Sequence, residues 1–510
     1  MEAITHDFSP VIIVKGLIVA ILLAVIGNGL YNRYLHPLSH IPGPIWSSVT
    51  DLFKLHVLLS QNLSTMGIEL HKKYGPVVRI APNMLSFSDP AILPKVYHKN
   101  ADKNDFWIPG ALGKIPGMIQ VQDHQEHAVK RRILAPALSV KSLMQLEYKL
   151  DDRIQRTFKA LHLKFSNTQQ PCNFPEWVRW FLYDTFTDIV FSESLDLTEN
   201  ERDVDGMLGA FRSSAWMVGL TTMFPWIMGP LFNAPLLGNY LLPHHSDKQG
   251  VGKIMSLRDR WMNKRLLESN EKTRDDILSK FLESHYMQPE HLNLDEVEAE
   301  ILMMMIAAPD TTSALICSLV NNIIQNKHVY DSLMCEIQEL ERGGFLSSPI
   351  VSYEDVKSMT YLLACIDETS RIAPSVPVVL PRRVSKGGTI LSGYFIPEGA
   401  EIGTSAPVIN NNETIFGPQT NEFQPERWLG NSDKIVAMKR CLFSWGWGSR
   451  KCVAKNMSLM QTMKFTAQLF RDFHVLSASP DNPWSHREDK GFTIHENQYL
   501  IFERRTPSTR

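Results

Sequence analysis

The stretch Phe443-Ser-Trp-Gly-Trp-Gly-Ser-Arg-Lys-Cys452 constrains the fold of this chain more than any other. Gly446 and Gly448 carry no Cβ, so the backbone there can turn tightly and approach a flat ligand closely. Arg450 offers a planar fork that suits a carboxylate. Cys452 comes just before an apolar, helix-like run, whose N-terminal dipole favours a thiolate. A glycine loop, an arginine and a thiolate together form a cradle suited to an iron porphyrin with two propionates.

Two simpler interpretations of this stretch stay open at this point. Spaced glycines before a helix also occur in nucleotide-phosphate loops, although the third glycine and the strand–helix–strand context are missing here. A lone cysteine such as Cys452 is also commonly a small buried residue without any chemistry. The rest of the chain has to decide between a ligand and simple packing.

Composition excludes several classes of protein. The chain has 510 residues, 44% of them hydrophobic, which is enough for a large core. Its 52 basic and 54 acidic residues leave a net charge of -2, so no footprint of a nucleic-acid partner is visible. Six cysteines are scattered without a CxxC pair, which argues against a structural zinc site and against a secreted disulfide framework. Helical periodicity dominates and strand-like runs are short, so we predict a mainly α protein with small β-sheets.

The N-terminal region carries the one membrane-like segment of the sequence. Val11 to Leu30 is apolar apart from one lysine and one asparagine, and is about long enough to cross a hydrocarbon core. No small-x-small cleavage site precedes the basic residues, so we predict a transmembrane helix rather than a signal peptide. Arg33 follows the helix, whereas Glu2 and Asp7 precede it. This bias places the bulk of the chain on the cytoplasmic side.

The long helix predicted from Asn293 to Gln325 carries a polar break in its middle, Ala307-Ala-Pro-Asp-Thr-Thr312. Its proline removes one backbone donor, so a carbonyl one turn earlier loses its helical partner. An opened turn followed by Asp310 and Thr311 would offer protons or water a route into a dry pocket. The alternative is a kinked core helix in which the two threonines bond back to their own turn.

A second helix, Tyr361 to Ile372, places Glu368 and Arg371 within reach of each other at i,i+3. Such a pair contributes little at a surface, but the neighbouring residues are so apolar that we predict a buried pair. A buried pair needs further hydrogen-bond partners, and Arg427 is a candidate.

One further pair of basic residues lies in the segment His124 to Arg132. His127 and Arg131 stand one helical turn apart and face the same way. A solvated basic face is the simplest account of them. If an anionic cofactor lies near, both become candidate carboxylate partners.

These four stretches, in this order and across essentially the whole chain, resemble the cytochrome P-450 family of haem-thiolate monooxygenases, in particular its membrane-anchored fungal branch. Three departures from the family pattern stand out: Trp445 replaces the usual phenylalanine, Ala454 replaces a common glycine, and Ala308-Pro309 stands where a glycine and a small residue are typical. The matching positions are Gly448, Arg450 and Cys452 of the cysteine loop, Ala307, Asp310, Thr311 and Thr312 of the long helix, Glu368 and Arg371 with Arg427, and His127 with Arg131.

The resemblance implies the cytochrome P-450 fold preceded by one transmembrane helix, with haem b as the cofactor and Cys452 as its axial ligand. Asp310 and Thr311 would deliver protons, while Glu368, Arg371 and Arg427 would be structural. Electrons would come from NADPH through a membrane-bound NADPH-cytochrome reductase, with cytochrome b5 as a further donor, at the endoplasmic reticulum membrane. The expected cofactor contacts are Arg450, Gly448, Gly446, Trp445, His127 and Arg131. The expected divisions are a membrane anchor at 1–35, a proline-rich hinge at 36–50 and one haem-thiolate catalytic domain at 51–510.

The expected substrate is a lipophilic small molecule, and similarity to fungal pathway enzymes suggests the tailoring of a secondary metabolite. One alternative is a haem-thiolate isomerase or dehydratase that does not activate dioxygen. Another is a membrane-tethered haem or lipid carrier without turnover. The segments expected to line the substrate pocket are Asn104 to Gln122, Ala210 to Pro225, Met303 to Ala307, Val376 to Leu380 and the turn near Phe492.

Overall fold

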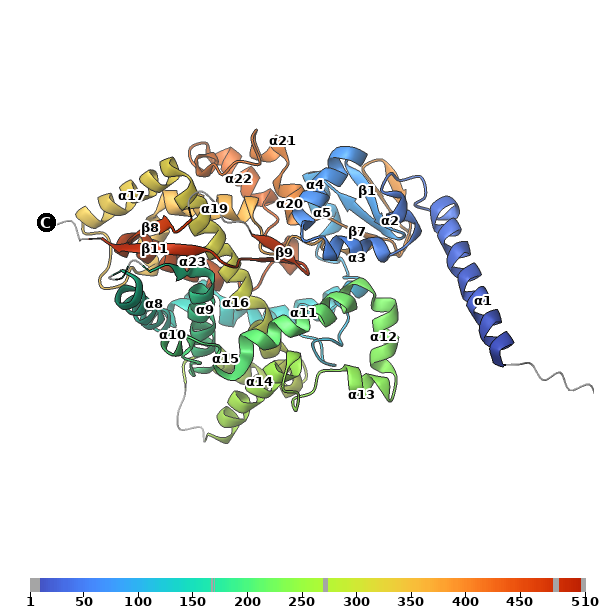
Figure 1. Ribbon diagram of the computed structural model, residues 1–510, viewed down its shortest axis with the longest axis horizontal. Helices are drawn as coiled ribbons and strands as arrows, with labels where there is room; N and C mark the ends of the chain where they lie inside the picture. The colour runs from blue at the N-terminus through green and yellow to red at the C-terminus, as the bar shows by residue number, and fades with distance from the viewer. Residues whose placement is uncertain (1–9, 167, 169, 269–273, 480–485, 506–510) are drawn as a thin grey trace, which may run out of the picture.

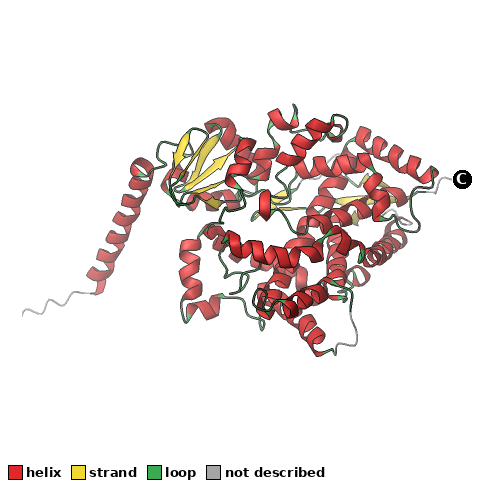
Figure 2. Cartoon of the chain, turned by 180° about the vertical axis from the view of Figure 1, so that it is seen from behind, coloured by secondary structure: helices red, strands yellow, loops and turns green. Residues whose placement is uncertain are grey.

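Helices make up most of the chain, and its strands gather into small sheets (Figures 1 and 2). The structure is a computed structural model that describes residues 10–166, 168, 170–268, 274–479 and 486–505. Glu2 and Asp7, on which part of the orientation argument depends, lie outside these residues. The prediction of a mainly α protein with small β-sheets is confirmed.

The long helix predicted from Asn293 to Gln325 forms as α16 (Leu294–Gln325), and it lies at the centre of the helical packing. Asn293 caps it by accepting a hydrogen bond from the backbone N–H of Glu296, whose side chain accepts from the backbone N–H of Asn293 in return. Helices α9 (Phe174–Phe191), α19 (Thr360–Ile372) and α23 (Lys455–Asp472) pack against it. Contact with helices on several sides explains why α16 is apolar around most of its circumference.

The other helices surround this group. The longer ones are α6 (His124–Leu134), α8 (Glu147–Leu161), α11 (Met207–Met223), α12 (Pro225–Asn233), α14 (Gly250–Leu267), α15 (Ile277–Met287), α17 (Lys327–Arg342) and α22 (Ser432–Cys441). The shorter ones include α2 (Ile45–Val49), α5 (Leu93–Val96), α7 (Val140–Met144), α13 (Leu237–Leu241), α18 (Tyr353–Ser358), α20 (Ala406–Asn410) and α21 (Glu413–Phe416).

Among the described residues, the strands form one four-stranded sheet, one three-stranded sheet and two hairpins. Two strand-like runs, Val77 to Ile80 and Met84 to Phe87, predict a hairpin, which forms in the largest sheet as β1 (Val77–Ala81) and β2 (Met84–Phe87). Strand β2 pairs in parallel with β7 (Glu401–Gly403), which pairs with β4 (Arg382–Arg383). The smaller sheets are β3 (Cys172–Asn173), β11 (Tyr499–Arg504) and β8 (Phe473–Ser477), then β9 (Arg487–Asp489) with β10 (Phe492–Ile494), and β5 (Thr389–Leu391) with β6 (Tyr394–Ile396).

One predicted helix is wrong in its extent. The helical pattern of the sequence from about Asp51 to Tyr74 predicts one helix, but these residues form two, α3 (Leu52–Leu59) and α4 (Leu63–Tyr74). Gln61 between them has a φ of 57°, a left-handed conformation that no helix can continue through. The apolar spacing continued across this break, which is why periodicity alone did not reveal it.

The apolar helix at the N-terminus extends from the globule (Figure 1). Within the described residues, α1 (Pro10–Leu30) continues into a short π-helix, Tyr31–Leu35. The span Val14–Leu35 is long and apolar enough to cross a membrane and is only 6% buried, whereas α16 passes the same test but is 78% buried. The structure therefore supports the N-terminal helix as the candidate anchor.

The proline-rich segment after this helix packs closely onto the globule. Leu38 and Ile41 are buried in the core beside the large sheet. The backbone N–H of Arg79 donates to the carbonyl of Pro42 at 2.8 Å, and the Ser47 hydroxyl donates to the carbonyl of Arg79 at 2.6 Å. These contacts attach the segment to β1, so it meets the sheet as well as the membrane helix.

Candidate active site

The cysteine loop lies between α22 and α23, and its two glycines are both in conformations that suit glycine. Gly446 has a φ of 72° and Gly448 a φ of 67°. A Cβ on Gly448 would also overlap the carbonyl oxygen of Tyr97. The backbone N–H of Cys452 donates to the carbonyl of Trp445 at 2.9 Å, which closes the turn.

The thiol of Cys452 is free, and it is accessible to solvent although protein surrounds it. It lies just before α23, where the backbone N–H groups of Ala454 and Lys455 point at the sulfur, as the predicted helix start requires. Burial nevertheless raises the pKa of the Cys452 thiol, and these N–H groups and the nearby Arg131 only oppose the rise. The helix start alone therefore does not produce a thiolate, and a bound metal ion would have to complete the deprotonation.

The predicted Glu368–Arg371 pair is fully buried, and Arg427 joins it as expected. Arg371 donates to both carboxylate oxygens, at 2.9 and 2.8 Å, and Arg427 donates at 2.9 Å. The indole N–H of Trp428 and the backbone N–H of Gln424 also donate to Glu368. Five hydrogen bonds satisfy this carboxylate, as a charge in a dry interior requires.

Asn410 connects this cluster to the cysteine loop, and no motif in the sequence marks it. Its amide donates to the carbonyl of Arg371 at 3.1 Å and to the Ser444 hydroxyl at 2.8 Å. Its carbonyl oxygen accepts from the backbone N–H of Phe443 at 3.0 Å. The Ser444 hydroxyl in turn donates to the carbonyl of Ser370. The loop that carries Cys452 is thus fixed to α19 at the position of the buried ion pair.

On the other side of the loop, the three predicted basic residues come together. Arg450 donates to the carbonyls of Val121 and Gln122, at 2.6 and 2.7 Å, and Arg131 donates to the carbonyl of Lys451 at 2.6 Å. His127 is 4% exposed. In the described part of the chain the two guanidinium groups bond to backbone carbonyls and form no ion pair.

Two further basic residues, Arg382 of β4 and Lys103, belong to this cluster and were missed from the sequence. Both are buried, and Lys103 forms a β-bridge with Arg382. Burial and the surrounding cations lower the pKa of His127 to about 3 and that of Arg450 to about 10, and they lower the pKa of Lys103 well below its usual value. Arg382 follows a strand-like run that had been assigned only to the pocket, so nothing marked it as a cofactor contact.

The residues present fit a haem group. Five basic side chains lie close together without a carboxylate partner, and buried charges normally have one. Two propionates would supply the missing negative charge. The free thiol of Cys452, a residue exposed to solvent, provides a ligand atom, and the glycine turn beside it has no Cβ that would keep a flat ring from the backbone.

In the long helix, the structure matches the alternative rather than the opened turn. Helix α16 continues through Pro309 without interruption. The Thr311 hydroxyl donates to the carbonyl of Ala307 at 2.8 Å, and the Thr312 hydroxyl donates to that of Ala308 at 2.9 Å. Two back-bonded hydroxyls thus support the turn that the proline weakens. The Thr312 hydroxyl also lies 3.0 Å from that of Ser458, which joins α16 to α23.

Helix α9 holds the carboxylate of Asp310. The Tyr183 hydroxyl donates to one carboxylate oxygen at 2.8 Å, and the Arg179 guanidinium lies 3.7 Å from the other. Tyr183 is 1% exposed, and burial together with the negative charge of Asp310 raises the pKa of its phenol. Neither Tyr183 nor Arg179 was predicted, because only the packing of α9 on α16 brings them to Asp310.

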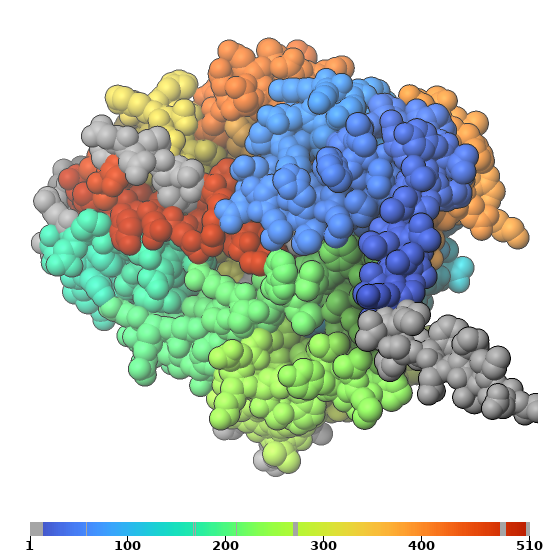
Figure 3. All heavy atoms as spheres, turned by 45° about the vertical axis from the view of Figure 1, so that its right-hand side comes forward, coloured from blue at the N-terminus to red at the C-terminus, as the bar shows by residue number. Residues whose placement is uncertain are grey.

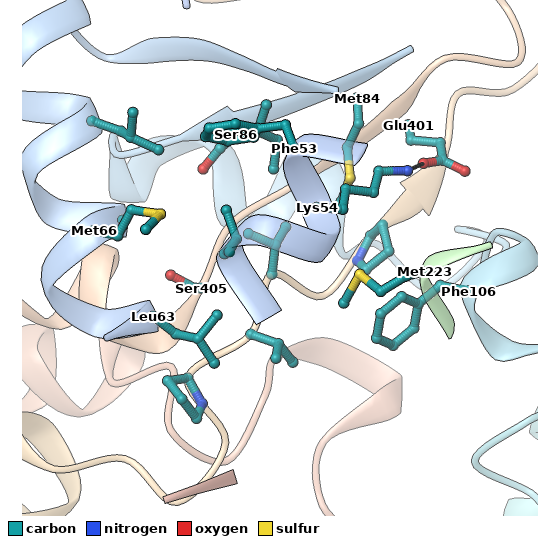
Figure 4. A pocket seen from close by; sticks show the side chains of 18 of the residues that line it. Phe53, Lys54, Leu63, Met66, Met84, Ser86, Phe106, Met223, Glu401 and Ser405 are labelled. Atoms are coloured by element: carbon teal, nitrogen blue, oxygen red, sulfur yellow. Dashed lines mark ion pairs between the residues drawn. The ribbon is translucent and has the colours of Figure 1, made fainter. Parts of the chain in front are cut away.

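A separate pocket of about 120 Å³ lies near the large sheet, away from the cysteine loop (Figure 4). Figure 4 shows Phe106 and Met223 close together at one end, and Lys54 extending toward Glu401, with which it forms an ion pair at 4.0 Å. Three of the five segments predicted to line the substrate pocket contribute to it: the loop at Phe106, the end of α11 at Met223 and residues 377–379. Met303 to Ala307 and Phe492 are not part of its lining.

Comparison with known proteins agrees with this site. The family model described as Cytochrome P450 matches residues 41–502. Cytochrome P450 monooxygenase gsfF of Penicillium aethiopicum is 29% identical over 486 residues, which are 92% of this chain and 94% of that protein. Quiannulatic acid synthase of Emericella variicolor is 26% identical, covering 89% of this chain and 91% of that protein. Cytochrome P450 monooxygenase cicH of Emericella nidulans is 27% identical, covering 93% and 95%.

The family match covers the cysteine loop, the long helix, the buried Glu368 cluster and the basic cluster together. It confirms the resemblance on which the site residues were chosen. The chain therefore belongs to the cytochrome P-450 family, haem-containing oxidoreductases that incorporate oxygen from O2.

Proposed function

We propose that this chain is a membrane-anchored monooxygenase that binds haem b through Cys452 and oxidises a lipophilic secondary metabolite. One observation carries the proposal: an accessible thiol lies beside five basic side chains that lack carboxylate partners. Haem bound there would supply dioxygen binding and O–O bond cleavage, which a thiolate ligand favours. Gly446, Gly448 and Trp445 would lie against the ring.

The basic cluster would orient the cofactor. Arg450 and Arg131 each use part of the guanidinium on a backbone carbonyl, which fixes the direction of the remaining N–H groups. His127 is neutral at physiological pH, since its pKa is lowered to about 3, and it would donate one N–H to a propionate. Arg382 and Lys103 would extend the same function.

Asp310 and Thr311 would handle protons on the long helix. Thr311 has a hydroxyl that already donates to Ala307, so its oxygen is left to accept a hydrogen bond. The carboxylate of Asp310 accepts a hydrogen bond from the Tyr183 phenol of α9, a group that carries a proton. Asp310 and Thr311 are neighbours in the sequence, and the presence of this acid–hydroxyl pair counts against an isomerase or dehydratase that needs no proton delivery to dioxygen.

The substrate proposal rests on the pocket and on the relatives. The pocket lining is mainly aliphatic and aromatic, which suits a lipophilic molecule. Relatives that match along most of their length come from Penicillium and Emericella, and one of them is named for an acid product. A tailoring step in a biosynthetic pathway is the role most consistent with both.

The membrane arrangement follows from the N-terminal helix. We expect residues 1–35 to anchor the chain, 36–50 to connect, and one catalytic domain from 51 to face the cytoplasm at the endoplasmic reticulum. Figure 3 shows α1 on the same face as α12 and α13. The side chains of Trp226, Leu236 and Tyr240 in this region are exposed, which suits contact with lipid. Electrons from NADPH would reach the haem through a partner reductase, with cytochrome b5 as a second donor.

The ligand assignment is tested by reducing the purified protein under carbon monoxide. We expect the red-shifted Soret band of a thiolate-ligated haem, and its loss together with activity in Cys452→Ala. Absence of the band in the wild type, or retained oxidation in the variant, would refute the assignment.

The reaction class is tested separately. Microsomes with reductase and NADPH, incubated with candidate pathway intermediates, should yield a product heavier by one oxygen atom in mass spectrometry. A product of unchanged composition formed without NADPH would favour the isomerase. Haem binding without any turnover would favour the carrier.

A further inference from the structure

The loop from Asn104 to Gln122 connects two parts of the predicted substrate pocket. Near its start, Asn104 and Phe106 line the pocket of Figure 4. Near its end, Gly117 and Met118 lie on the central helix α16. Within the described chain, a displacement of this loop would therefore change the pocket lining and the covering of α16 together.

Both ends of the loop are well attached. Arg450 donates to the carbonyls of Val121 and Gln122 at the C-terminal end. At the N-terminal end, the carbonyl of Asn104 accepts a hydrogen bond from the Gln122 side chain at 3.0 Å. In the middle of the loop, Gly110 and Gly113 exchange two backbone hydrogen bonds, and Ala111 packs against α12. These contacts leave residues 114–118 between two fixed points.

Besides the packing of Met118 in the main core, one hydrogen bond to another element holds that intervening part. The backbone N–H of Met118 donates to the carboxylate of Glu300 on α16 at 2.7 Å. Among the described residues it is the one hydrogen bond that joins residues 111–118 to anything outside the loop. A hydrogen bond to an ionised group in a dry place is stronger than one between neutral groups.

The surroundings of Glu300 are arranged around this contact. Glu300 is 5% exposed, and burial raises the pKa of its carboxyl, which the Met118 N–H and the charge of Lys130 oppose. Lys130 itself is shared by Glu126 and Glu296, at 3.1 and 3.0 Å, so it does not neutralise Glu300 by direct contact. The backbone N–H of Met118 is therefore the direct hydrogen-bond partner of the buried Glu300 carboxylate.

The glycine next to Met118 permits the close approach. A Cβ on Gly117 would come within 3.1 Å of the Cβ of Met303 and 3.3 Å of the carbonyl oxygen of Ala299. Met303 begins the segment of α16 that was predicted to face the substrate. The loop therefore covers α16 directly at the start of that segment.

We propose that the Glu300 carboxylate is a latch that holds the loop 104–122 closed against α16 and so sets how readily the pocket admits a ligand. Glu300 is a positioning residue here, acting through the loop backbone. The latch itself is independent of the haem, and only its effect on ligand entry depends on the proposed function.

Glu300→Met and Glu300→Gln test the latch, because they have similar volumes and only glutamine keeps an acceptor. Amide hydrogen exchange is measured on the full-length, haem-loaded protein. In Glu300→Met we expect the amides of residues 111–118 to exchange about 10- to 100-fold faster, and in Glu300→Gln at a rate within about threefold of wild type. Glu298→Gln is the matched control on the same helix, since Glu298 pairs with Arg258 and does not contact the loop.

A second readout uses imidazole as a probe that has to pass the loop to reach the haem iron. Its association rate, followed by the shift of the Soret band, should rise in Glu300→Met and stay near wild type in Glu300→Gln. Unchanged exchange in Glu300→Met, or equally fast exchange in both variants, would overturn the latch. If Glu300→Met does not fold, Gly117→Ala should raise the exchange of the same amides, and wild-type exchange there would equally overturn it. Loss of the carbon monoxide band in the wild type would count against the proposed function and leave the exchange result standing.

Discussion

Two regions of this molecule, the cysteine loop and residues 111–118, are held in place by different contacts. On one side, the loop that carries Cys452 is bound to α19 through Asn410 and rests beside a Glu368 carboxylate that accepts five hydrogen bonds. In the other region, one hydrogen bond, to Glu300, joins residues 111–118 to another element of the described chain, and the packing of Ala111, Leu112 and Met118 supplies the remaining contacts. The region that has to hold a ligand atom in one place is fixed by many hydrogen bonds. The region that has to admit a substrate has one hydrogen bond to another element.

The two regions also differ in the free energy needed to disrupt them. Breaking a buried ion pair leaves an uncompensated charge in a dry interior, which is strongly destabilising. A loop with few anchors opens locally at a much smaller free energy than global unfolding. We therefore expect substitutions on the Cys452 side to affect folding and cofactor retention, and substitutions on the loop side to affect ligand entry.

The largest effect is expected from Glu368→Ala. This change leaves Arg371 and Arg427 without their buried carboxylate and should lower the free energy of unfolding by about 3–5 kcal/mol. The cysteine loop should then lose its support, so the carbon monoxide spectrum should fall with stability. Denaturant unfolding and the spectrum of the same preparation measure both.

The matched control is Glu354→Ala on the preceding helix. Glu354 pairs with Lys357 with the same i,i+3 spacing, at 3.0 Å, but both side chains are exposed. Its removal should change the free energy of unfolding by less than about 1 kcal/mol. Equal effects of the two substitutions would contradict the view that burial makes the Glu368 cluster important.

Gly448→Ala should come next in size, and Gly446→Ala is its natural comparison. Both positions have positive φ, so alanine costs about 1–2 kcal/mol at either. At Gly448 the new methyl would also overlap the carbonyl oxygen of Tyr97, which adds about 1–3 kcal/mol of overpacking. At Gly446 the nearest atom would lie at 3.6 Å, so no such addition is expected. Thermal unfolding of the two variants separates strain from overlap, and equal losses would contradict the overlap.

Asn410→Ala should have a smaller effect, because it removes the connection but leaves the ion pair intact. The backbone N–H of Phe443 would lose its partner in the interior, at a cost of about 1–3 kcal/mol. Asn412→Ala, which removes only the cap of α21, should cost about 1 kcal/mol and leave the haem spectrum unchanged. A normal rate of haem loss in Asn410→Ala would show that the cysteine loop does not depend on this connection.

The same contrast explains what the sequence could predict. Cys452, the glycines, the Glu368 cluster and the long helix depend on residue types at short, fixed spacings, so pattern reasoning found them. Asn410, Tyr183, Arg382 and Lys103 reach the site only because distant elements pack together, and no local pattern records such contacts. The break at Gln61 was missed because the apolar spacing continues across it.

The pocket was predictable in outline only. Three of its lining segments were named, but the contribution of α3 and α4 was not, because an amphipathic helix near an anchor gives no sign of facing a ligand. The prediction of an opened turn at Pro309 does not agree with the structure, for a different reason. The two threonines that follow the proline return their hydroxyls to the preceding turn, and the helix continues.

The smallest effect on stability, and the most selective effect on function, is expected from Tyr183→Phe. The ring remains in the core, so only the hydrogen bond to Asp310 is lost, at a cost of about 1 kcal/mol. If this bond positions the acid for proton delivery, the fraction of NADPH that ends in product should fall about two- to tenfold, with more peroxide released, while the carbon monoxide spectrum stays intact. Tyr330→Phe, which removes the bond to His474 far from Asp310 in the sequence, should leave that fraction unchanged. The ratio of product to NADPH in both variants decides the matter, since a purely structural role for Tyr183 would lower stability without moving this ratio.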